Sequence, residues 1–376
     1  MTGGRRIVVI GGYGAFGALV AERLVRGGGC EVVIAGRSEV RGRAAAAELG
    51  TRFGCKVGSA AVDAALVTAA ELVALAAGHA PHGRAAVVVN ASGPFQGADY
   101  GLARACIEAR CHYVDLADGR AFVTGIAALD RDAKAAGVCV ISGASTVPGV
   151  SSAVVAAFRG AFSRLEGIEI AVSPGNHFQP GEATVKSILG YVGRPIAMRV
   201  DGAARTVYGW QGVTRVPIEG LGSRLMGYCE VPDLDLYPGV GTVVMRAGVE
   251  VVPFHLGLWA VSWLVRAGLV RDLAAWSGVL MRAKTWGARL GSDRGGMVVA
   301  MTGRGADGLQ QTLGWHLVAG SGHGPYIPAM ASVILARKLA RGGAVSCGAM
   351  ACFEAFSLEE FMAEVAGLDI AATVVS

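Results

Sequence analysis

The stretch RRIVVIGGYGAFG, residues Arg5 to Gly17, indicates how the chain begins to fold. Its β-branched run, Ile7 to Ile10, is typical of a buried strand, and the segment from Ala18 to Arg26 favours a helix. In a dinucleotide-binding unit, the first glycine of a GxGxxG motif makes the turn, the second lets backbone approach a pyrophosphate, and the third lets helix and strand pack closely. We therefore predict a nucleotide site formed by Gly12, Tyr13, Gly14, Ala15, Phe16 and Gly17. The alternative is an ordinary glycine-rich turn, because the chain has 57 Gly among 376 residues.

The end of the second predicted strand, Glu31 to Ala35, indicates which nucleotide binds. An NAD-binding protein usually carries an acid there that accepts from the ribose 2′-hydroxyl. This chain has Gly36, Arg37 and Ser38 instead. A guanidinium can bind a 2′-phosphate through a bidentate pair, whereas a carboxylate would repel it. We expect NADP at Arg37 and Ser38; the alternative is a solvated Arg at a strand end.

Length and composition restrict the class of protein. A chain of 376 residues predicts two domains. The hydrophobic fraction is 53%, but the longest apolar run, 251–265, contains Pro253 and His255 and is closed by Arg266. We expect a buried helix with an aromatic face rather than a membrane span. Contact with a lipid surface or a hydrophobic substrate is the alternative.

Charge and cysteine spacing exclude several further classes. A net charge of +5 without a basic run does not indicate nucleic acid. The eight Cys form no CxxC pair and no zinc-type spacing with His, so we expect reduced thiols and no metal. The N-terminal residues lead directly into the first strand without a cleavable signal, and we expect a cytoplasmic protein.

The first 145 residues alternate strand-like and helix-like segments, which predicts a parallel sheet covered on both faces. Beyond Pro148-Gly149 the spacing changes, and we predict an α+β domain with an antiparallel sheet. The expected domains are 1–149, a Rossmann-like domain; 150–325, for substrate and oligomerisation; and 326–376, the C-terminal helices. The predicted strands are Ile7–Ile10, Glu31–Ala35, Cys55–Ala61, Ala85–Asn90, His112–Asp115 and Val138–Ile141, followed by Ile168–Val172, Thr206–Trp210, Val243–Val252, Met297–Thr302 and Thr312–Val318.

Five motifs resemble the NADP-binding domain of saccharopine dehydrogenase-like oxidoreductases. In chain order they are GGYGAFG, AGRS, NASGPFQG, ARACIEARCHYVDLAD and ISGASTVPGVSS. The downstream segment GHGPYIP is similar to a bacterial branch of that family. The resemblance implies a Rossmann-like domain, an antiparallel substrate domain, and last helices, in 326–376, that return to the first domain. It also implies oxidation or reduction of C=N, or in some branches C=C, bonds with a nicotinamide. Saccharopine-type and lysine-type members carry Asp directly before the Pro-Gly where this chain has Val147, so amino-acid substrates are less expected.

In an open α/β sheet, ligands bind beyond the carboxyl ends of the strands. We expect further cofactor contacts there from Asp63, Asn90, Ala91, Ser92, Gly93, Pro94 and Phe95. Asp115 and Tyr113 are titratable groups at a strand end and are candidates for proton transfer, with a turn carboxylate as the alternative for Asp115. Lys186 and His323 are further catalytic candidates, and Val147, Pro148, His177, Trp210 and Gln211 are candidates for contact with substrate. A solvated or structural role is the alternative for each of these residues. If the proton came from water or from a ribose hydroxyl, the reaction would need none of these side chains.

These observations predict an NADP(H)-dependent oxidoreductase, expected as a homodimer, that acts on a C=N or C=O bond of a small, partly apolar molecule. One alternative is an enoyl reductase with a lipid-like substrate. Another is a nucleotide-binding regulatory protein without catalysis, since Val147 stands where relatives carry an acid.

Overall fold

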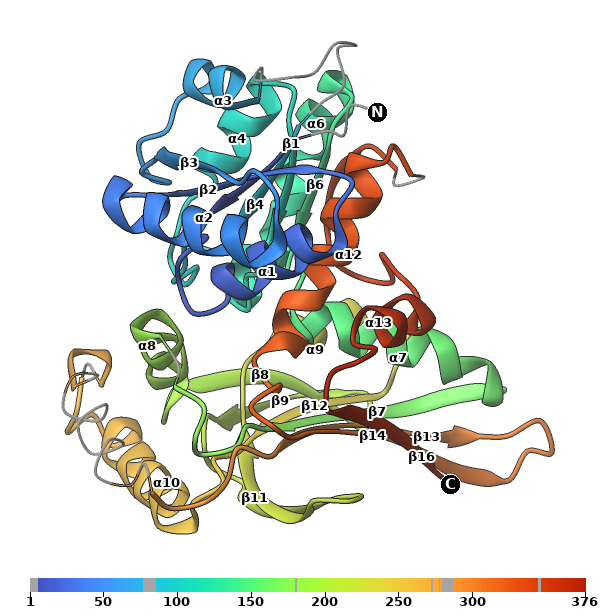
Figure 1. The fold of residues 1–376 in the computed structure, drawn as a ribbon. Coiled ribbons are helices and arrows are strands. Elements are labelled where there is room, and N and C mark those ends of the chain that lie inside the picture. Colours follow the sequence, from blue (N-terminus) through green and yellow to red (C-terminus); the bar gives the residue numbers. More distant parts are fainter. Residues whose placement is uncertain are drawn as a thin grey trace. The chain divides into compact units, whose positions relative to one another are not determined.

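The computed structural model describes residues 6–76, 86–179, 181–271, 273–276, 278, 287, 289–343 and 346–376. They fall into two compact units (Figure 1). The first comprises Met1–Val150 and Tyr326–Glu364, and the second comprises Ser151–Pro325 and Val365–Ser376. The C-terminal part of the chain therefore contributes to both units.

A parallel sheet forms the centre of the first unit. Its strand order in the described ranges is β15-β6-β5-β4-β1-β2-β3, and every pairing in it is parallel. Consecutive parallel strands need a crossover, so each is followed by a helical segment. The strands are β1 (Arg6–Ile10), β2 (Glu31–Gly36), β3 (Gly58–Ala61), β4 (Val87–Asn90), β5 (His112–Asp115), β6 (Cys139–Ser142) and β15 (Gly348–Ala351).

Helices cover both faces of this sheet (Figure 1). Helix α1 contacts α2 and α12 on one face, and α4 contacts α3 and α6 on the other. A near-continuous apolar strand such as Val87 to Val89 is expected in a sheet that is buried on both sides. The helical segments are α1 (Gly17–Gly27), α2 (Glu39–Phe53), α3 (Ala69–Ala76), α4 (Gly101–Glu108), α5 (Arg120–Gly125), η1 (Ile126–Leu129), α6 (Asp130–Ala136), η2 (Thr146–Val150), α12 (Tyr326–Ala340) and α13 (Leu358–Glu364).

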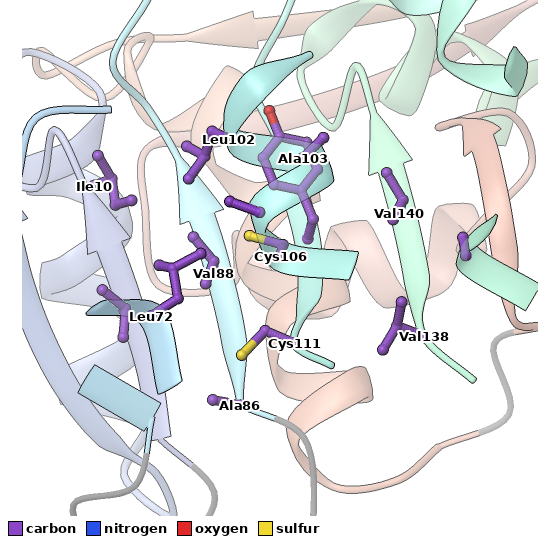
Figure 2. Packing of buried hydrophobic residues seen from close by; sticks show 14 of the residues in the cluster. Ile10, Leu72, Ala86, Val88, Leu102, Ala103, Cys106, Cys111, Val138 and Val140 are labelled. Carbon is purple, nitrogen blue, oxygen red and sulfur yellow. The ribbon is translucent and has the colours of Figure 1, made fainter. Parts of the chain in front are cut away.

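The core beneath α4 is apolar and contains two free thiols. Figure 2 shows side chains of this cluster from the sheet and from α4, among them Ile10, Val88, Val140, Leu102, Ala103 and Cys106. Burial raises the pKa of the Cys106 thiol well above its ordinary value and raises that of Cys111 to about 11. These two cysteines are free and act as core side chains.

An ion-pair cluster joins the C-terminal helices α12 and α13 to helix α1 within the first unit. Glu364 at the end of α13 pairs with Arg23 of α1 at 3.1 Å and also with Arg337 of α12. All three side chains are largely buried, so removing one partner would leave an uncompensated charge.

The sheet of the second unit is largely antiparallel, as expected, and one parallel pair makes it mixed. Strand β12 pairs in parallel with β7, whereas β7 pairs antiparallel with β13, and β13 with β14. The path is β10-β11-β12-β7-β13-β14-β16, with β8 joining β12 and β9 pairing with β8. The strands are β7 (Arg164–Ser173), β8 (Pro195–Val200), β9 (Ala203–Tyr208), β10 (Thr214–Ile218), β11 (Gly222–Tyr228), β12 (Thr242–Ala247), β13 (Gly295–Arg304), β14 (Gln310–Ala319) and β16 (Ile370–Val375).

The predicted strand Val243–Val252 is too long, because β12 ends at Ala247 and a helix begins at Val252. That helix, α10 (Val252–Arg266), has Pro253 in its first turn, where the missing N–H costs nothing. The other helical segments of this unit are α7 (Ser151–Phe158), η3 (Arg159–Ala161), α8 (Glu182–Tyr191), α9 (Asp233–Leu236) and η4 (Ala274–Trp276).

Helix α10 also differs from the expected buried helix with an aromatic face. Its aromatic side is exposed, with Trp259 at 38% and Trp263 at 47% of full exposure. None of the helices in the described ranges has the length and apolar character that crossing a bilayer requires.

Candidate functional site

The glycines between β1 and α1 have different roles. Gly11 has a φ of +78° and so makes the sharp turn that the sequence analysis assigned to Gly12. A Cβ on Gly12 would lie 2.8 Å from the carbonyl oxygen of Val9. A Cβ on Gly17 would overlap with the carbonyl oxygen of Gly11. The packing of strand, turn and helix therefore requires glycine at both positions.

Gly14 is less crowded than Gly12 and Gly17. Among the described residues, the one heavy atom within 4 Å of an added Cβ is the Gly11 carbonyl oxygen, at 3.1 Å. Helix α1 begins three residues later, and no side chain caps its N-terminus. Exposed backbone next to an uncapped helix start can accept the phosphates of a nucleotide. Nearby, Ala15 is exposed and Phe16 is half-buried.

Tyr13 joins the glycine turn to the end of β2. Its hydroxyl accepts a hydrogen bond from the backbone N–H of Ser38 at 2.7 Å. A Cβ on Gly36 would lie 2.6 Å from that hydroxyl, so the glycine makes room for the ring. The guanidinium of Arg41 lies over the ring, 4.7 Å from its centroid. Tyr13 is thus held in place by protein contacts on both sides.

Two guanidinium groups lie at the carboxyl end of β2. Arg37 is exposed, and within the described ranges its side chain makes no ion pair. Arg41 is exposed in the first turn of α2, where its backbone N–H donates to the Oγ of Ser38 at 3.4 Å. The sequence analysis missed Arg41. The spacing Arg37-Ser38-x-x-Arg41, with Ser38 as the helix N-cap, is the signal that could have found it.

Asp63 follows β3, and its carboxylate accepts from the backbone N–H of Ala65 at 3.1 Å. The side chain is exposed at the same carboxyl edge of the sheet as Arg37, because β2 and β3 are parallel neighbours. Asp63 therefore shapes the turn after β3 and keeps an exposed carboxylate at this edge.

The loop after β4 is held by Asn90. The buried Asn90 amide donates from Nδ2 to the Tyr113 hydroxyl at 3.1 Å, and its Oδ1 accepts from the backbone N–H of Ser92 at 3.0 Å. Ala91 lies against the glycine turn, since a Cβ on Gly11 would be 2.8 Å from the Ala91 carbonyl oxygen. The two loops are therefore adjacent, with Ser92 and Pro94 exposed and Gly93 half-buried.

Phe95 points into the core. Its ring is 5.4 Å from that of Phe122, and it packs with Ala117 and Val123. The side chain anchors the loop rather than presenting a surface to a ligand.

Asp115 is fully buried at the end of β5. Its Oδ1 accepts from the backbone N–H groups of Gly143 at 2.8 Å and Ala117 at 2.9 Å, and from the Ser142 hydroxyl at 3.0 Å. Burial raises the pKa of this carboxyl group to about 6, although these hydrogen bonds and one with Tyr113 oppose the shift. Burial also raises the pKa of Tyr113 well above its ordinary value. This geometry favours the turn-carboxylate alternative: Asp115 fixes the loop after β6.

That loop leads to Val147 and Pro148, and both are buried. Gly149 packs against α12, since a Cβ there would lie 3.2 Å from the Cβ of Ala331. The position that carries Asp in the resembled enzymes is therefore occupied here by a buried apolar side chain.

The second unit carries the other sequence-predicted residues. His177, in the loop between β7 and α8, and Lys186 on α8 are both exposed. Trp210 and Gln211 are buried; Gln211 accepts from Arg266 at 2.9 Å. His323 accepts from the backbone N–H of Asp369 at 2.8 Å through Nδ1, so it ties the turn before α12 to the start of β16.

The structure shows two groups that sequence patterns did not single out. His255 on α10 is fully buried with its ring 5.1 Å from that of Trp210, and burial lowers its pKa to about 4. Asp233 in α9 is fully buried beside the Ser151 hydroxyl, and burial raises its pKa to about 6. No sequence motif marks either residue, because the residues that contact it come from distant parts of the chain.

Comparison with a family model matches residues 7–141 to the saccharopine dehydrogenase NADP binding domain. A search of curated proteins found no match to this chain. Among solved structures, the chain is similar to the apo histidine-tagged saccharopine dehydrogenase (L-Glu forming) from Saccharomyces cerevisiae. That match has a TM-score of 0.66 and 14% identity, and covers 99% of this chain and 100% of the yeast chain. At this identity the match shows the fold.

Two further structures have lower scores. A probable dehydrogenase from Thermotoga maritima has a TM-score of 0.45 and 14% identity, covering 96% of this chain and 93% of that one. GenD2 from gentamicin A biosynthesis, in complex with NAD, has a TM-score of 0.39 and 16% identity, covering 83% and 72%.

Proposed function

We propose, on the premise that residues 7–141 match the model of the saccharopine dehydrogenase NADP binding domain, that the chain is an NADP(H)-dependent oxidoreductase. The reaction we propose is hydride transfer to or from a C=N or C=O bond of a small, partly apolar substrate. The family and the fold support an oxidoreductase. The bond type and the substrate are our inference from the residues.

The low crowding around Gly14 is the observation that carries the proposal. Gly12 and Gly17 are required by protein packing, but nothing in the described structure other than one backbone oxygen limits a side chain at Gly14. A ligand that approaches the backbone explains why glycine stands at a position with few protein atoms around it. The nucleotide therefore fits the residues present, with its pyrophosphate at Gly14 and the start of α1.

Arg37 and Arg41 support the choice of NADP. Both are exposed at the carboxyl end of β2, and Arg41 is oriented by stacking on Tyr13. A 2′-phosphate there would receive charge-assisted hydrogen bonds from Arg37, Arg41 and the Ser38 hydroxyl. The second guanidinium strengthens the case that the sequence made from Arg37 alone.

The bound nicotinamide supplies the hydride chemistry, and the protein supplies binding and geometry. We propose that Asn90 fixes the Ser92–Pro94 loop, through its bonds to Ser92 and Tyr113, so that the loop lies over the nicotinamide side of the site. Asp115 acts as a positioning residue, because its Oδ1 holds Gly143. Lys186 and His177, both exposed, remain our candidates for proton transfer and substrate contact.

Val147 supports a partly apolar substrate. An amino-acid substrate needs charged partners when it is taken from water. The amino-acid-reducing relatives present an Asp at this position, whereas Val147 is buried and apolar. A reductase of enoyl bonds in a lipid-like substrate is the second candidate, and the exposed Trp259 and Trp263 favour it.

The test on the purified protein is NADPH consumption with the compounds that can accept a hydride, and NADP⁺ reduction with the amines that can donate one. The panel pairs saccharopine, lysine and other amino-acid/keto-acid couples with hydrophobic imines, ketones and enoyl compounds. We expect no detectable turnover of the amino-acid couples and turnover of at least one apolar imine or ketone. The Gly14→Ala variant is the control for consumption that does not need the nucleotide site.

Turnover restricted to an amino-acid couple would contradict the substrate class. Turnover restricted to enoyl compounds would favour the second candidate. A silent panel with NADPH tightly bound would contradict catalysis and favour a nucleotide-binding regulatory protein.

A further inference from the structure

Helix α10 of the second unit carries an exposed apolar face, which we define as Val252, Leu256, Trp259 and Trp263. Their exposed fractions are 42%, 44%, 38% and 47%. At 100° per residue these four positions fall within roughly 60° of the helix circumference. The two indole rings meet edge to face, with centroids 6.5 Å apart. This α10 face is therefore one continuous stripe.

The opposite side of α10 fixes the direction in which the stripe points. Val265 is buried in a cluster with Val192 and Trp210, and Leu258 and Val261 pack against it. The helix cannot rotate its tryptophans inward without removing these residues from the core. In Figure 1, α10 lies at the edge of the second unit, drawn in yellow-orange.

Helix α10 itself carries Arg266 and no acid. Glu250, just before the helix, is largely buried in an ion pair with Arg224, and Arg271, beyond the helix, is followed in the sequence by Asp272. Arg266 lies at the C-terminal end of the stripe, with its guanidinium 5.1 Å from the Trp263 ring centroid and 3.8 Å from that of Tyr208. A tryptophan-rich apolar stripe flanked by arginines has the composition of helices that lie in a membrane interface.

Pairing of α10 with a second copy of itself is less favourable on charge. In an antiparallel pair, Arg266 would meet the N-terminal half of the other α10, which has no acid; in a parallel pair, it would meet another Arg266. The phosphates of an anionic bilayer supply the missing opposite charge. The helix has 15 residues, about 22 Å in length, so it can lie on a bilayer but not cross one.

We propose that the α10 face docks on the surface of an anionic lipid bilayer, with Trp259 and Trp263 at the level of the headgroups and Arg266 and Arg271 against lipid phosphates. The protein then binds membranes peripherally and reversibly. This inference does not rest on the proposed oxidoreductase activity.

The test is co-sedimentation of the full-length protein with vesicles of phosphatidylcholine alone or of phosphatidylcholine and phosphatidylglycerol at 3:1. We expect binding to the anionic vesicles, weaker binding to the neutral ones, and a blue shift of tryptophan fluorescence on binding. The double variant Trp259→Gln/Trp263→Gln should lower the partition constant by about tenfold or more. Arg271→Gln should weaken binding to anionic vesicles while leaving binding to neutral ones nearly unchanged.

Leu309→Gln is the matched control, because Leu309 is an exposed apolar residue (68%) of the same unit outside α10. It should bind vesicles as the wild type does. The melting temperature without ligand reports whether each variant is folded, so the vesicle test does not depend on nucleotide binding.

Two results would overturn the proposal. One is the absence of anionic-vesicle binding by the wild type, or equal binding by the double variant. The other is a dimer, detected by light scattering, that the double variant dissociates without any vesicle binding; the α10 face would then be an interface between two copies.

Discussion

At the scale of single residues, the site depends on glycines that look alike in the sequence. The GxGxxG spacing predicted the turn correctly, because strand, turn and helix are adjacent in the chain and their requirements are local. It assigned the sharp bend to Gly12, whereas Gly11 makes the bend with its positive φ. The N-cap residue Ser38 was the sequence signal for Arg41, but the stacking of Arg41 on Tyr13 joins two separate elements and could not be predicted from periodicity.

The contrast between Gly14 and Gly17 gives a prediction. In Gly14→Ala the added Cβ lies 3.1 Å from one backbone oxygen, so the fold should persist with a small loss of stability. The same atom would occupy the space for the pyrophosphate, and stabilisation by NADPH should disappear. Gly17→Ala places its Cβ against the Gly11 carbonyl, and we expect a lower melting temperature even without ligand.

Thermal-shift titration with NADPH measures both effects. If Gly14→Ala gained as much stability from NADPH as the wild type, the nucleotide would not bind where we place it.

At the scale of elements, the parallel strands were largely predictable and the short or non-local ones were not. His112–Asp115 has the predicted bounds because its β-branched and aromatic residues lie between clear helices. Strand β15, with the sequence Gly-Ala-Met-Ala, has no strand-like pattern and forms through pairing with β6. The parallel pairing of β7 with β12 was missed because strand direction is set by long-range connections rather than by composition.

The junction of β5 and β6 gives a prediction for pH. The pKa of Asp115 is raised from 3.8 to about 6 in the folded protein, chiefly by burial. Between these values the unfolded chain loses its proton first, so this group lowers the free energy of unfolding as the pH rises from about 4 to about 6. A pKa that is about two units higher in the folded protein lowers the free energy of unfolding by about 3 kcal/mol, and this decrease is complete above pH 6.

Asp115→Asn keeps an acceptor for Gly143 and Ala117 but cannot ionise. Measured by denaturant unfolding, its free energy of unfolding relative to the wild type should therefore rise between pH 4 and pH 7. A difference that stays constant with pH would show that Asp115 remains ionised in the folded protein.

At the scale of the whole molecule, the sequence predicted a nucleotide-binding domain followed by a second domain, and the fold matches that of saccharopine dehydrogenase. The C-terminal segment is shared between the units: α12 and α13 belong to the first and β16 to the second. The sequence analysis expected helices throughout 326–376, returning to the first domain, and did not predict the strand β16. The exposed side of α10 was also unpredictable, because an apolar run of fifteen residues is equally consistent with a buried helix.

The central claim is that the first unit binds NADP(H), and titration calorimetry of the purified protein with NADPH and NADH at one ionic strength tests it most directly. We expect NADPH to bind at least about tenfold more tightly, because charge-assisted hydrogen bonds to the 2′-phosphate contribute roughly 1.5–3 kcal/mol. Arg37→Ala should remove most of that preference and leave NADH nearly unchanged. Arg43→Ala should preserve it, because Arg43 lies on α2 and is paired with Glu39. Binding of neither nucleotide, or tighter binding of NADH by the wild type, would contradict the account.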